Sequence, residues 1–260
     1  MLSKVWVVIP AAGVGARMQA DRPKQYLPLA GKTVIEHTLA CFAGHPAIAG
    51  IVVVVSAQDP FWPQLPVKEM PIFTAIGGKE RADSVLNGLN YLTEQLQAAE
   101  SVNVLVHDAA RPCLSRDDLD RLLAAGADES AGAILAIPVR DTMKRAGTNF
   151  SPHISHTENR EGLWHALTPQ MARLGVLRTA LTDALRKGSS ITDEASALEQ
   201  SGLHPLLVEG DARNIKITRP ADLALAEFFW LPEMKNPACA GLPFLMEPAL
   251  LALLPSHRLS

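Results

Sequence analysis

Residues 51–55 read IVVVV, and this run of β-branched side chains constrains the fold more than any other feature of the sequence. A strand with no polar side chain on either face is typical of a parallel sheet that is buried on both sides. Further apolar runs at 5–9, 72–76, 102–106 and 132–139 predict additional strands. Because helical patterns separate these runs, we expect a doubly wound, mostly parallel, Rossmann-like α/β sheet. Its ligand should bind at the carboxyl ends of the strands.

Helices are predicted where apolar residues recur at helical spacing, over 33–43, 81–97, 117–127 and 174–187. Thr33 and Glu36 have the spacing of a capping box at the start of the first helix. Thr192 is expected to cap a short helix further along the chain. The pattern is completed by two short strands and a last helix, at 206–208, 214–218 and 220–229.

The segment 140–168 interrupts the alternation of strands and helices, since it is polar and has no apolar stripe of helical spacing. Alternating residues at 142–145 and 153–157 predict a β-hairpin that projects from the sheet. A lone hairpin has unpaired edges and is marginally stable, so it needs a partner surface. We therefore expect this arm to mediate dimerisation.

With 260 residues, 48% of them hydrophobic, the chain can bury a sizeable core, and we expect one domain at 1–230. The tail at 231–260 is rich in proline and is expected to be loosely structured. A net charge of −3 provides no basic field for nucleic acid, and no apolar run approaches the length of a membrane span. The 3 cysteines lie far apart without a CxxC pair, as expected for reduced thiols of a cytoplasmic protein.

The residues after the first predicted strand, PAAGVGARMQADRPKQY at 10–26, have the composition of an anion-binding loop. Small residues let backbone N–H groups approach a phosphate, and Arg17 and Lys24 would place positive charge beside it. The dinucleotide fingerprint fits poorly because Met18 occupies its third glycine position. A Walker loop fits worse because Tyr26 stands at its first glycine position. On this stretch alone, a nucleotide triphosphate loop and an ordinary surface turn both remain open.

Seven motifs occur in order along the chain: AAGVGARM with PKQY, GGKERADSV, HDAARP, RDTMKR, ENREGLWHALTPQ, ITDEASALE and NIKITRP. On these motifs the chain, over roughly residues 3–230, resembles the family of sugar- and polyol-phosphate cytidylyltransferases. The resemblance is strongest to members that act on 2-C-methyl-D-erythritol 4-phosphate in the non-mevalonate isoprenoid pathway. It implies transfer of a cytidylyl group from CTP to this polyol phosphate, with release of pyrophosphate. It also implies Mg²⁺ bound mainly through the CTP phosphates, and a homodimer whose arms exchange residues between active sites.

The same resemblance assigns roles to individual residues. Arg17 and Lys24 would stabilise the transition state at the α-phosphate, and Arg160 and Lys216 would orient the acceptor phosphate as the remaining catalytic residues. The nucleotide would be contacted by Pro10, Ala11, Ala12, Gly13, Gly15, Gly78, Ser84, Asp108 and Ala109. The acceptor would be contacted by Asp108, Arg111, Thr142, Arg160, Thr168 and Lys216. No firm protein ligand for the metal is expected, with Asp108 the one weak candidate.

Two other functions remain open. One is a cytidylyltransferase for another polyol phosphate, such as ribitol 5-phosphate, although the ENREGLWHALTPQ and NIKIT motifs favour methylerythritol phosphate. The other is a nucleotide-binding or regulatory domain without catalytic activity, against which the full set of four cations argues. A zinc site at His153 and His156, or at His107, is disfavoured because no third ligand follows at a metal-like spacing.

Overall fold

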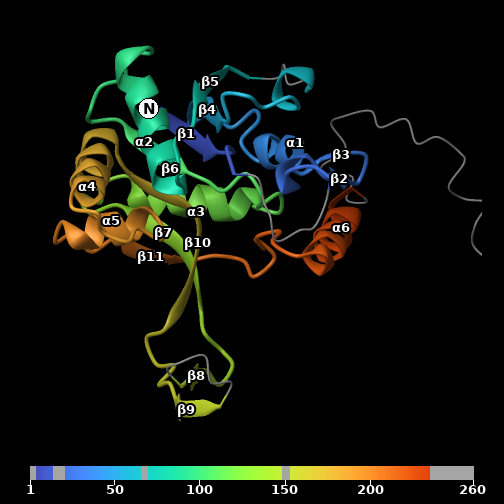
Figure 1. Cartoon of the computed structure of the whole chain (residues 1–260), viewed down its shortest axis with the longest axis vertical. Helices are drawn as coiled ribbons and strands as arrows, with labels where there is room; N and C mark the ends of the chain where they lie inside the picture. The colour runs from blue at the N-terminus through green and yellow to red at the C-terminus, as the bar shows by residue number, and fades with distance from the viewer. Residues whose placement is uncertain (1–3, 14–20, 66–69, 148–152, 235–260) are drawn as a thin grey trace, which may run out of the picture.

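The structure is a computed structural model that describes residues 4–13, 21–65, 70–147 and 153–234. Within these residues, one sheet contains β1 (Val5–Pro10), β4 (Ile48–Val55), β5 (Ile72–Ile76), β6 (Asn103–Val106), β7 (Ala133–Pro138), β10 (Trp164–Arg173) and β11 (Leu206–Glu209). The strand order is β11-β7-β10-β6-β1-β4-β5. The helices around it are α1 (Val34–Ala40), α2 (Arg81–Glu94), α3 (Arg116–Gly126), α4 (Leu174–Arg186), α5 (Glu194–Gln200) and α6 (Pro220–Met234) (Figure 1).

The central strands are buried on both faces, as the β-branched runs predict. On β1, Val7 and Ile9 belong to a core shared with α1 and α3, whereas Val8 belongs to a second core shared with α2, α4 and α5. Helix α2 lies close to the sheet because Gly88 has no side chain. A Cβ atom there would come within 2.6 Å of Val8 and 2.9 Å of Val54. The doubly wound α/β sheet is thus confirmed, and its core consists of two apolar layers.

One strand of the sheet runs against the others. β10 is antiparallel to both of its neighbours, β6 and β7, whereas β1, β4, β5 and β6 pair in parallel. The sequence did not predict β10, because Pro169 lies within it and proline argues against a central strand. In the structure the ladder with β7 shifts register between Ala166 and Gln170, so Pro169 falls where no backbone N–H is needed.

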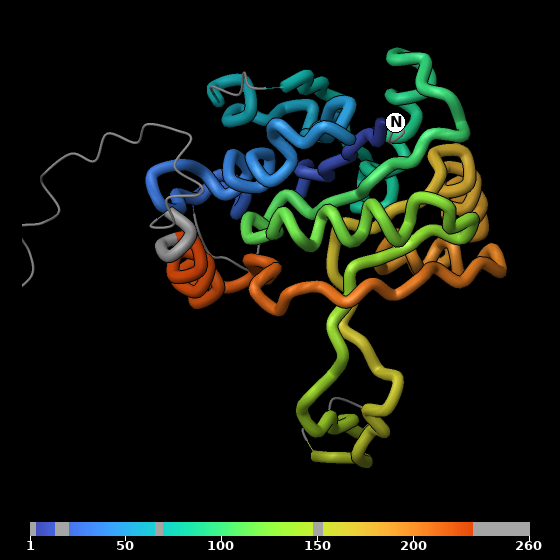
Figure 2. Tube along the Cα trace, turned by 180° about the vertical axis from the view of Figure 1, so that it is seen from behind, coloured from blue at the N-terminus to red at the C-terminus, as the bar shows by residue number. Residues whose placement is uncertain are grey.

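A two-stranded hairpin projects from the sheet beyond the ends of β7 and β10 (Figures 1 and 2). It pairs β8 (Lys144–Ala146) with β9 (Ile154–Thr157) in antiparallel fashion, and the side chains of both strands are exposed. The predicted projecting arm is therefore present, but its predicted end was wrong, because residues 164–168 belong to β10, which pairs with β7 in the central sheet. The use of the arm in dimerisation remains a prediction.

Some predicted boundaries were wrong. Helix α2 ends at Glu94, and α5 is capped by Asp193, not Thr192, since the Asp193 carboxylate accepts the N–H of Ser196 at 3.0 Å. Residues 214–218 form no strand, because their backbone groups bond to loops: the Ile217 N–H donates to the Ala110 carbonyl at 2.9 Å. The last helix continues to residue 234, into the predicted tail, and 235–260 lie outside the described residues.

A small apolar cluster beside the sheet packs α6 against the hairpin of β2 (Pro28–Leu29) and β3 (Lys32–Thr33). It includes Leu27, Leu29, Ile217 and Ala226. Thr33 caps α1 and forms the predicted capping box with Glu36. Among the described residues, none of the helices has both the length and the apolar character that crossing a membrane requires.

Candidate active site

A cavity of about 480 Å³ opens at the carboxyl ends of β1, β5 and β6, the edge at which a doubly wound sheet binds its ligands. Its volume is in the range of small-molecule sites. The loops after these three strands meet there with the segment before α6. The lining residues are Pro10, Ala11, Ala12, Gly13, Lys24, Gln25, Gly78, Lys79, Glu80, Arg81, Ser84, Asp108, Ala109, Ala110, Lys216 and Thr218.

Gln25 fixes the end of the first loop. Its buried side-chain amide donates to the carbonyl oxygens of Ala11 at 2.7 Å and Gly13 at 3.1 Å. The neighbouring Lys24 donates from Nζ to the carbonyl of Ile217 at 2.9 Å. The short 3₁₀ turn Lys24–Tyr26 therefore ties the loop to the far end of the chain and places a cation on the cavity wall.

The second loop has two glycines that allow close approach. The Gly77 N–H donates to the Val55 carbonyl at 2.8 Å, and a Cβ on Gly77 would come within 2.5 Å of the Ala12 side chain. The Gly78 N–H donates to Ser84 Oγ at 3.1 Å, which holds the turn against the start of α2. The first and second loops are thus packed against each other, and together they form part of one cavity wall.

The carboxylate of Asp108 is surrounded by three cationic side chains. This buried carboxylate accepts Arg81 Nε at 3.0 Å and Lys216 Nζ at 2.8 Å, and it lies 3.6 Å from Arg111 Nε. Burial alone would raise the pKa of Asp108. The charges of Arg81, Lys216 and Arg111 outweigh this effect and hold the pKa of the carboxyl well below its usual range. Asp108 is therefore ionised at any working pH and anchors three cations, of which Arg81 and Lys216 line the cavity.

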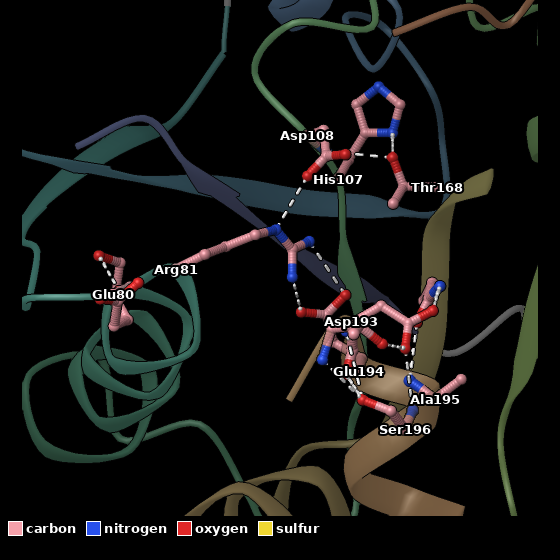
Figure 3. A network of polar contacts seen from close by, with 12 residues as sticks. Glu80, Arg81, His107, Asp108, Thr168, Asp193, Glu194, Ala195 and Ser196 are labelled. Carbon is pink, nitrogen blue, oxygen red and sulfur yellow. Dashed lines mark hydrogen bonds and ion pairs between the residues drawn. The ribbon is translucent and has the colours of Figure 1, made fainter. Parts of the chain in front are cut away.

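Arg81 joins Asp108 to α5 (Figure 3). Its Nη1 and Nη2 atoms donate to the two carboxylate oxygens of Glu194 at 2.7 and 3.2 Å. Glu194 is buried, with a side chain only 2% exposed. Burial lowers the pKa of Arg81, but the charges of Glu194 and Asp108 more than compensate and raise it above its ordinary value.

His107 lies behind Asp108 as a neutral ring. Its Nε2 is 3.1 Å from the Arg111 carbonyl, which can only accept, and its Nδ1 is 3.0 Å from Thr168 Oγ1. Thr168 Oγ1 accepts the Asp108 N–H at 3.1 Å and can therefore donate its own proton to Nδ1. Burial lowers the pKa of His107 to about 4, so the ring stays neutral near pH 7. Both nitrogens bond to protein groups, which leaves neither for a metal.

Most predicted site residues come together. The cavity is lined by Pro10, Ala11, Ala12, Gly13, Lys24, Gly78, Ser84, Asp108, Ala109 and Lys216. Arg111 and Thr168 are buried directly behind Asp108. Thr142 and Arg160 lie on the exposed arm, where Arg160 Nη1 donates to the Arg140 carbonyl, and neither lines the cavity. Gly15 and Arg17 lie outside the described residues.

Several site residues were missed. Gln25, Lys79, Glu80, Arg81, Ala110 and Thr218 also line the cavity, and Glu194 supports it. All seven lie in motifs singled out from the sequence: Gln25 in PKQY, Lys79, Glu80 and Arg81 in GGKERADSV, Ala110 in HDAARP, Glu194 in ITDEASALE and Thr218 in NIKITRP. For the six residues that line the cavity, their place in motifs expected near this edge of the sheet was the signal that could have identified them. Within the described residues, no group of three or more His, Cys, Asp or Glu side chains could hold a metal ion.

A doubly wound sheet with a cation-lined, nucleotide-sized cavity at this edge defines the class of α/β nucleotidyltransferases. The profile of a family described as "IspD: 2-C-methyl-D-erythritol 4-phosphate cytidylyltransferase" matches residues 5–231. The chain belongs to this family.

An individual protein and a crystal structure similar to this chain carry the name of the same family. The 2-C-methyl-D-erythritol 4-phosphate cytidylyltransferase of Vibrio parahaemolyticus serotype O3:K6 is 57% identical over 223 residues, which cover 85% of this chain and 93% of the relative. The crystal structure of the Francisella tularensis enzyme of that name superposes with a TM-score of 0.75 at 38% identity, covering 87% of this chain and 100% of that chain. A crystal structure of a 4-diphosphocytidyl-2C-methyl-D-erythritol synthase gives a TM-score of 0.74 at 42% identity, covering 88% and 99%.

Proposed function

We propose that this protein transfers a cytidylyl group from CTP to 2-C-methyl-D-erythritol 4-phosphate, in the non-mevalonate isoprenoid pathway. The family supports this reaction, and one observation supports it at the level of chemistry: Lys24, Arg81 and Lys216 all line one cavity. The two substrates are both polyanions, so a site that joins them must offset their mutual repulsion. Fixed cations in a partly buried cavity do this without reorganisation during the reaction.

In the proposed reaction, a phosphate oxygen of the acceptor attacks the α-phosphorus of CTP. The new P–O bond forms as the bond between the α-phosphorus and the bridging oxygen to the β-phosphate breaks, and pyrophosphate leaves with the electron pair. The acceptor phosphate is already ionised near neutral pH, so no general base is required. Catalysis then depends on in-line positioning and on stabilising the charge that develops at the phosphorus.

The described residues fit distinct roles in that step. Lys24 would bind the triphosphate near the α-phosphate, together with Arg17 of the same loop. Lys216, held by Asp108, would bind the acceptor phosphate. The backbone of Ala11, Ala12 and Gly78 would contact the cytosine, because these two packed loops line the same cavity.

Mg²⁺ fits this site through the nucleotide and not through a protein cage. The Asp108 carboxylate is shared by three cations, so it has little capacity left for a metal ion. We therefore propose that Mg²⁺ is held by phosphate oxygens and water, the ligation it commonly retains in nucleotide sites. The metal would screen the phosphate charges that the lysines do not reach.

We further propose a homodimer in which each arm contributes to the partner's cavity. Arg160 and Thr142 do not line the cavity of their own subunit, and the arm that carries them projects away from the sheet (Figure 2). A twofold arrangement would bring Arg160 to the acceptor side of the partner's cavity. A cytoplasmic location would give the enzyme access to CTP.

The deciding experiment measures pyrophosphate release with CTP or ATP against a panel of polyol phosphates. The proposal expects rapid turnover only with CTP and methylerythritol phosphate. Equal turnover with ATP would contradict a cytosine pocket, and a preference for ribitol 5-phosphate would reassign the acceptor. Nucleotide binding without turnover of any pair would indicate a non-catalytic domain.

A further inference from the structure

A buried ion pair links the cavity to a helix that does not itself line it. Glu194 is the first residue of α5, and its carboxylate receives two hydrogen bonds from Arg81, the first residue of α2. The two residues are 113 positions apart in the chain. The Arg81 side chain lines the cavity and is 29% exposed, whereas the Glu194 side chain is 2% exposed and does not line it. Arg81 therefore lies between the cavity residue Asp108 and the buried Glu194 (Figure 3).

The position of Glu194 is itself fixed by the sheet. Gln170 of β10 donates from Nε2 to the Asp193 carboxylate at 2.9 Å and accepts the Ala195 N–H at 2.8 Å through Oε1. Asp193 and Ala195 flank Glu194 on both sides. The start of α5 therefore cannot shift without breaking contacts to a central strand, and Glu194 provides a rigid partner for Arg81.

The Arg81–Glu194 ion pair affects how the cations are distributed around Asp108. Three cations, Arg81, Arg111 and Lys216, surround the single carboxylate of Asp108. Glu194 takes two of the hydrogen bonds of Arg81, so Arg81 occupies only the Oδ1 atom of Asp108. The Oδ2 atom pairs with Lys216 Nζ at 2.8 Å and lies 3.6 Å from Arg111 Nε.

We propose that Glu194 is a positioning residue: by holding Arg81 to the Oδ1 atom of Asp108, it keeps Arg81 away from Oδ2 and so positions Lys216 for the acceptor phosphate. Without the Glu194 carboxylate, Asp108 is the only remaining anionic partner of Arg81 in the network of Figure 3. Arg81 then competes with Lys216 for that carboxylate. The inference rests on the proposed function, because it assigns Lys216 to the acceptor.

The test is steady-state kinetics of Glu194→Gln with each substrate varied in turn. We expect the KM for methylerythritol phosphate to rise roughly tenfold, the equivalent of one hydrogen bond to a charged group. The KM for CTP should change by less than about twofold, since the loops that contact the base are untouched. Equal rises in both KM values, or wild-type kinetics, would overturn the proposal.

A double-variant cycle separates positioning from general stability. If Glu194 acts through Arg81, then Glu194→Gln adds no further change to the acceptor KM in an Arg81→Gln background. Additive effects would count against the proposal. Should Glu194→Gln fail to fold because Arg81 keeps only one of its two carboxylate partners, the Arg81→Gln/Glu194→Gln protein removes both charges and provides the measurement. Because no Arg81 then competes with Lys216, its acceptor KM should be no higher than that of Arg81→Gln, and a further rise overturns the inference.

Glu100→Gln is the matched control, because Glu100 pairs with Arg178 on the surface and its loss changes the net charge equally. It should leave both KM values unchanged. The wild-type assay reports separately on the proposed function: no turnover by the wild type defeats the assigned reaction, whereas normal wild-type turnover with an unaffected Glu194 variant defeats only the positioning role.

Discussion

Lys24 Nζ donates a hydrogen bond at 2.9 Å to the carbonyl oxygen of Ile217, a residue 193 positions further along the chain. The residue before Ile217 is Lys216, whose Nζ lies 2.8 Å from Asp108. One short backbone stretch thus sets the relative placement of two lysines that we assign to opposite substrates. It is itself held by Arg111, which donates to the Asn214 carbonyl at 2.6 Å.

Lys24→Ala is expected to lower kcat by roughly a hundredfold or more, the usual cost of losing one donor that stabilises transition-state charge. The measurement is pyrophosphate release at saturating CTP and acceptor. Lys32→Ala, which removes an exposed lysine of β3 outside the cavity, should retain normal kcat. A Lys24 variant with normal kcat and only a raised KM for CTP would show that this lysine binds substrate and does nothing more.

Refolding a mixture of Lys24→Ala and Arg160→Ala proteins is expected to restore activity. In a mixed dimer with exchanged arms, one site carries both defects and the other carries neither. Random pairing makes about half of the dimers mixed, so roughly a quarter of all sites should recover.

The structure supplies the matched control for that mixture. Lys24 and Lys216 line the same cavity of the same chain, so Lys24→Ala mixed with Lys216→Ala should leave one defect in every site and recover nothing. Lys216→Ala mixed with Arg160→Ala should recover like the first pair. If the first mixture stays inactive although mass measurements confirm mixed dimers, Arg160 acts within its own subunit.

Gly77→Ala is expected to raise the KM for CTP by about tenfold or more, because small displacements of a positioning loop are costly. The added Cβ would lie 2.5 Å from the Ala12 side chain and 2.9 Å from Ser84 Oγ, which forces the two base-contacting loops apart. Gly210→Ala is the control, since its Cβ meets Leu167 and Leu135 at ordinary distances of 3.4 and 3.5 Å. A Gly77→Ala enzyme with normal CTP affinity would contradict the placement of the base against these loops.

Acidification is expected to destabilise the fold through His107. Burial lowers the pKa of this ring from 6.5 to about 4, so between these values the unfolded chain binds a proton that the folded chain does not. Stability therefore falls as pH drops through this window, by about 2 kcal/mol between pH 6.5 and 5 from this group alone. Urea unfolding at several pH values measures it.

The His107→Gln protein should be less stable near pH 7 but should show a shallower loss on acidification. Burial also lowers the pKa of His37, whose contribution remains in both proteins and cancels in the comparison. His165→Gln, which removes an exposed imidazole outside the core, is the matched control and should keep the wild-type free energy of unfolding near pH 7. An unchanged slope in the His107 variant would assign the acid sensitivity to other groups.

Local patterns were sufficient to predict most of the fold. The strand at 72–76 and the cap at Thr33 were predicted correctly because each depends on residues adjacent in sequence. β10 was not predicted, because a proline within a central strand is acceptable only once a register shift removes the need for its N–H. That shift depends on pairing with β7, which a local pattern does not encode.

The same distinction applies to the site. The loops that meet at the cavity were predicted from the rule that parallel strands present their carboxyl ends on one edge. The ion pair between Arg81 and Glu194 was not predicted, although both residues lie in motifs noted from the sequence. Their contact depends on α2 and α5 lying on the same face of the sheet, where both belong to one core.

The strand order also determines when each strand can find its place during synthesis. β7 pairs with β10 and β11, both of which are made after it, and the described structure gives it no earlier neighbour in the sheet. A nascent chain that ends before residue 164 therefore carries the apolar segment around Ile134 and Leu135 with no strand to receive it. Such late, non-local pairing slows folding and exposes an aggregation-prone edge. β7 therefore joins the strands β6-β1-β4-β5 only after β10 has been made.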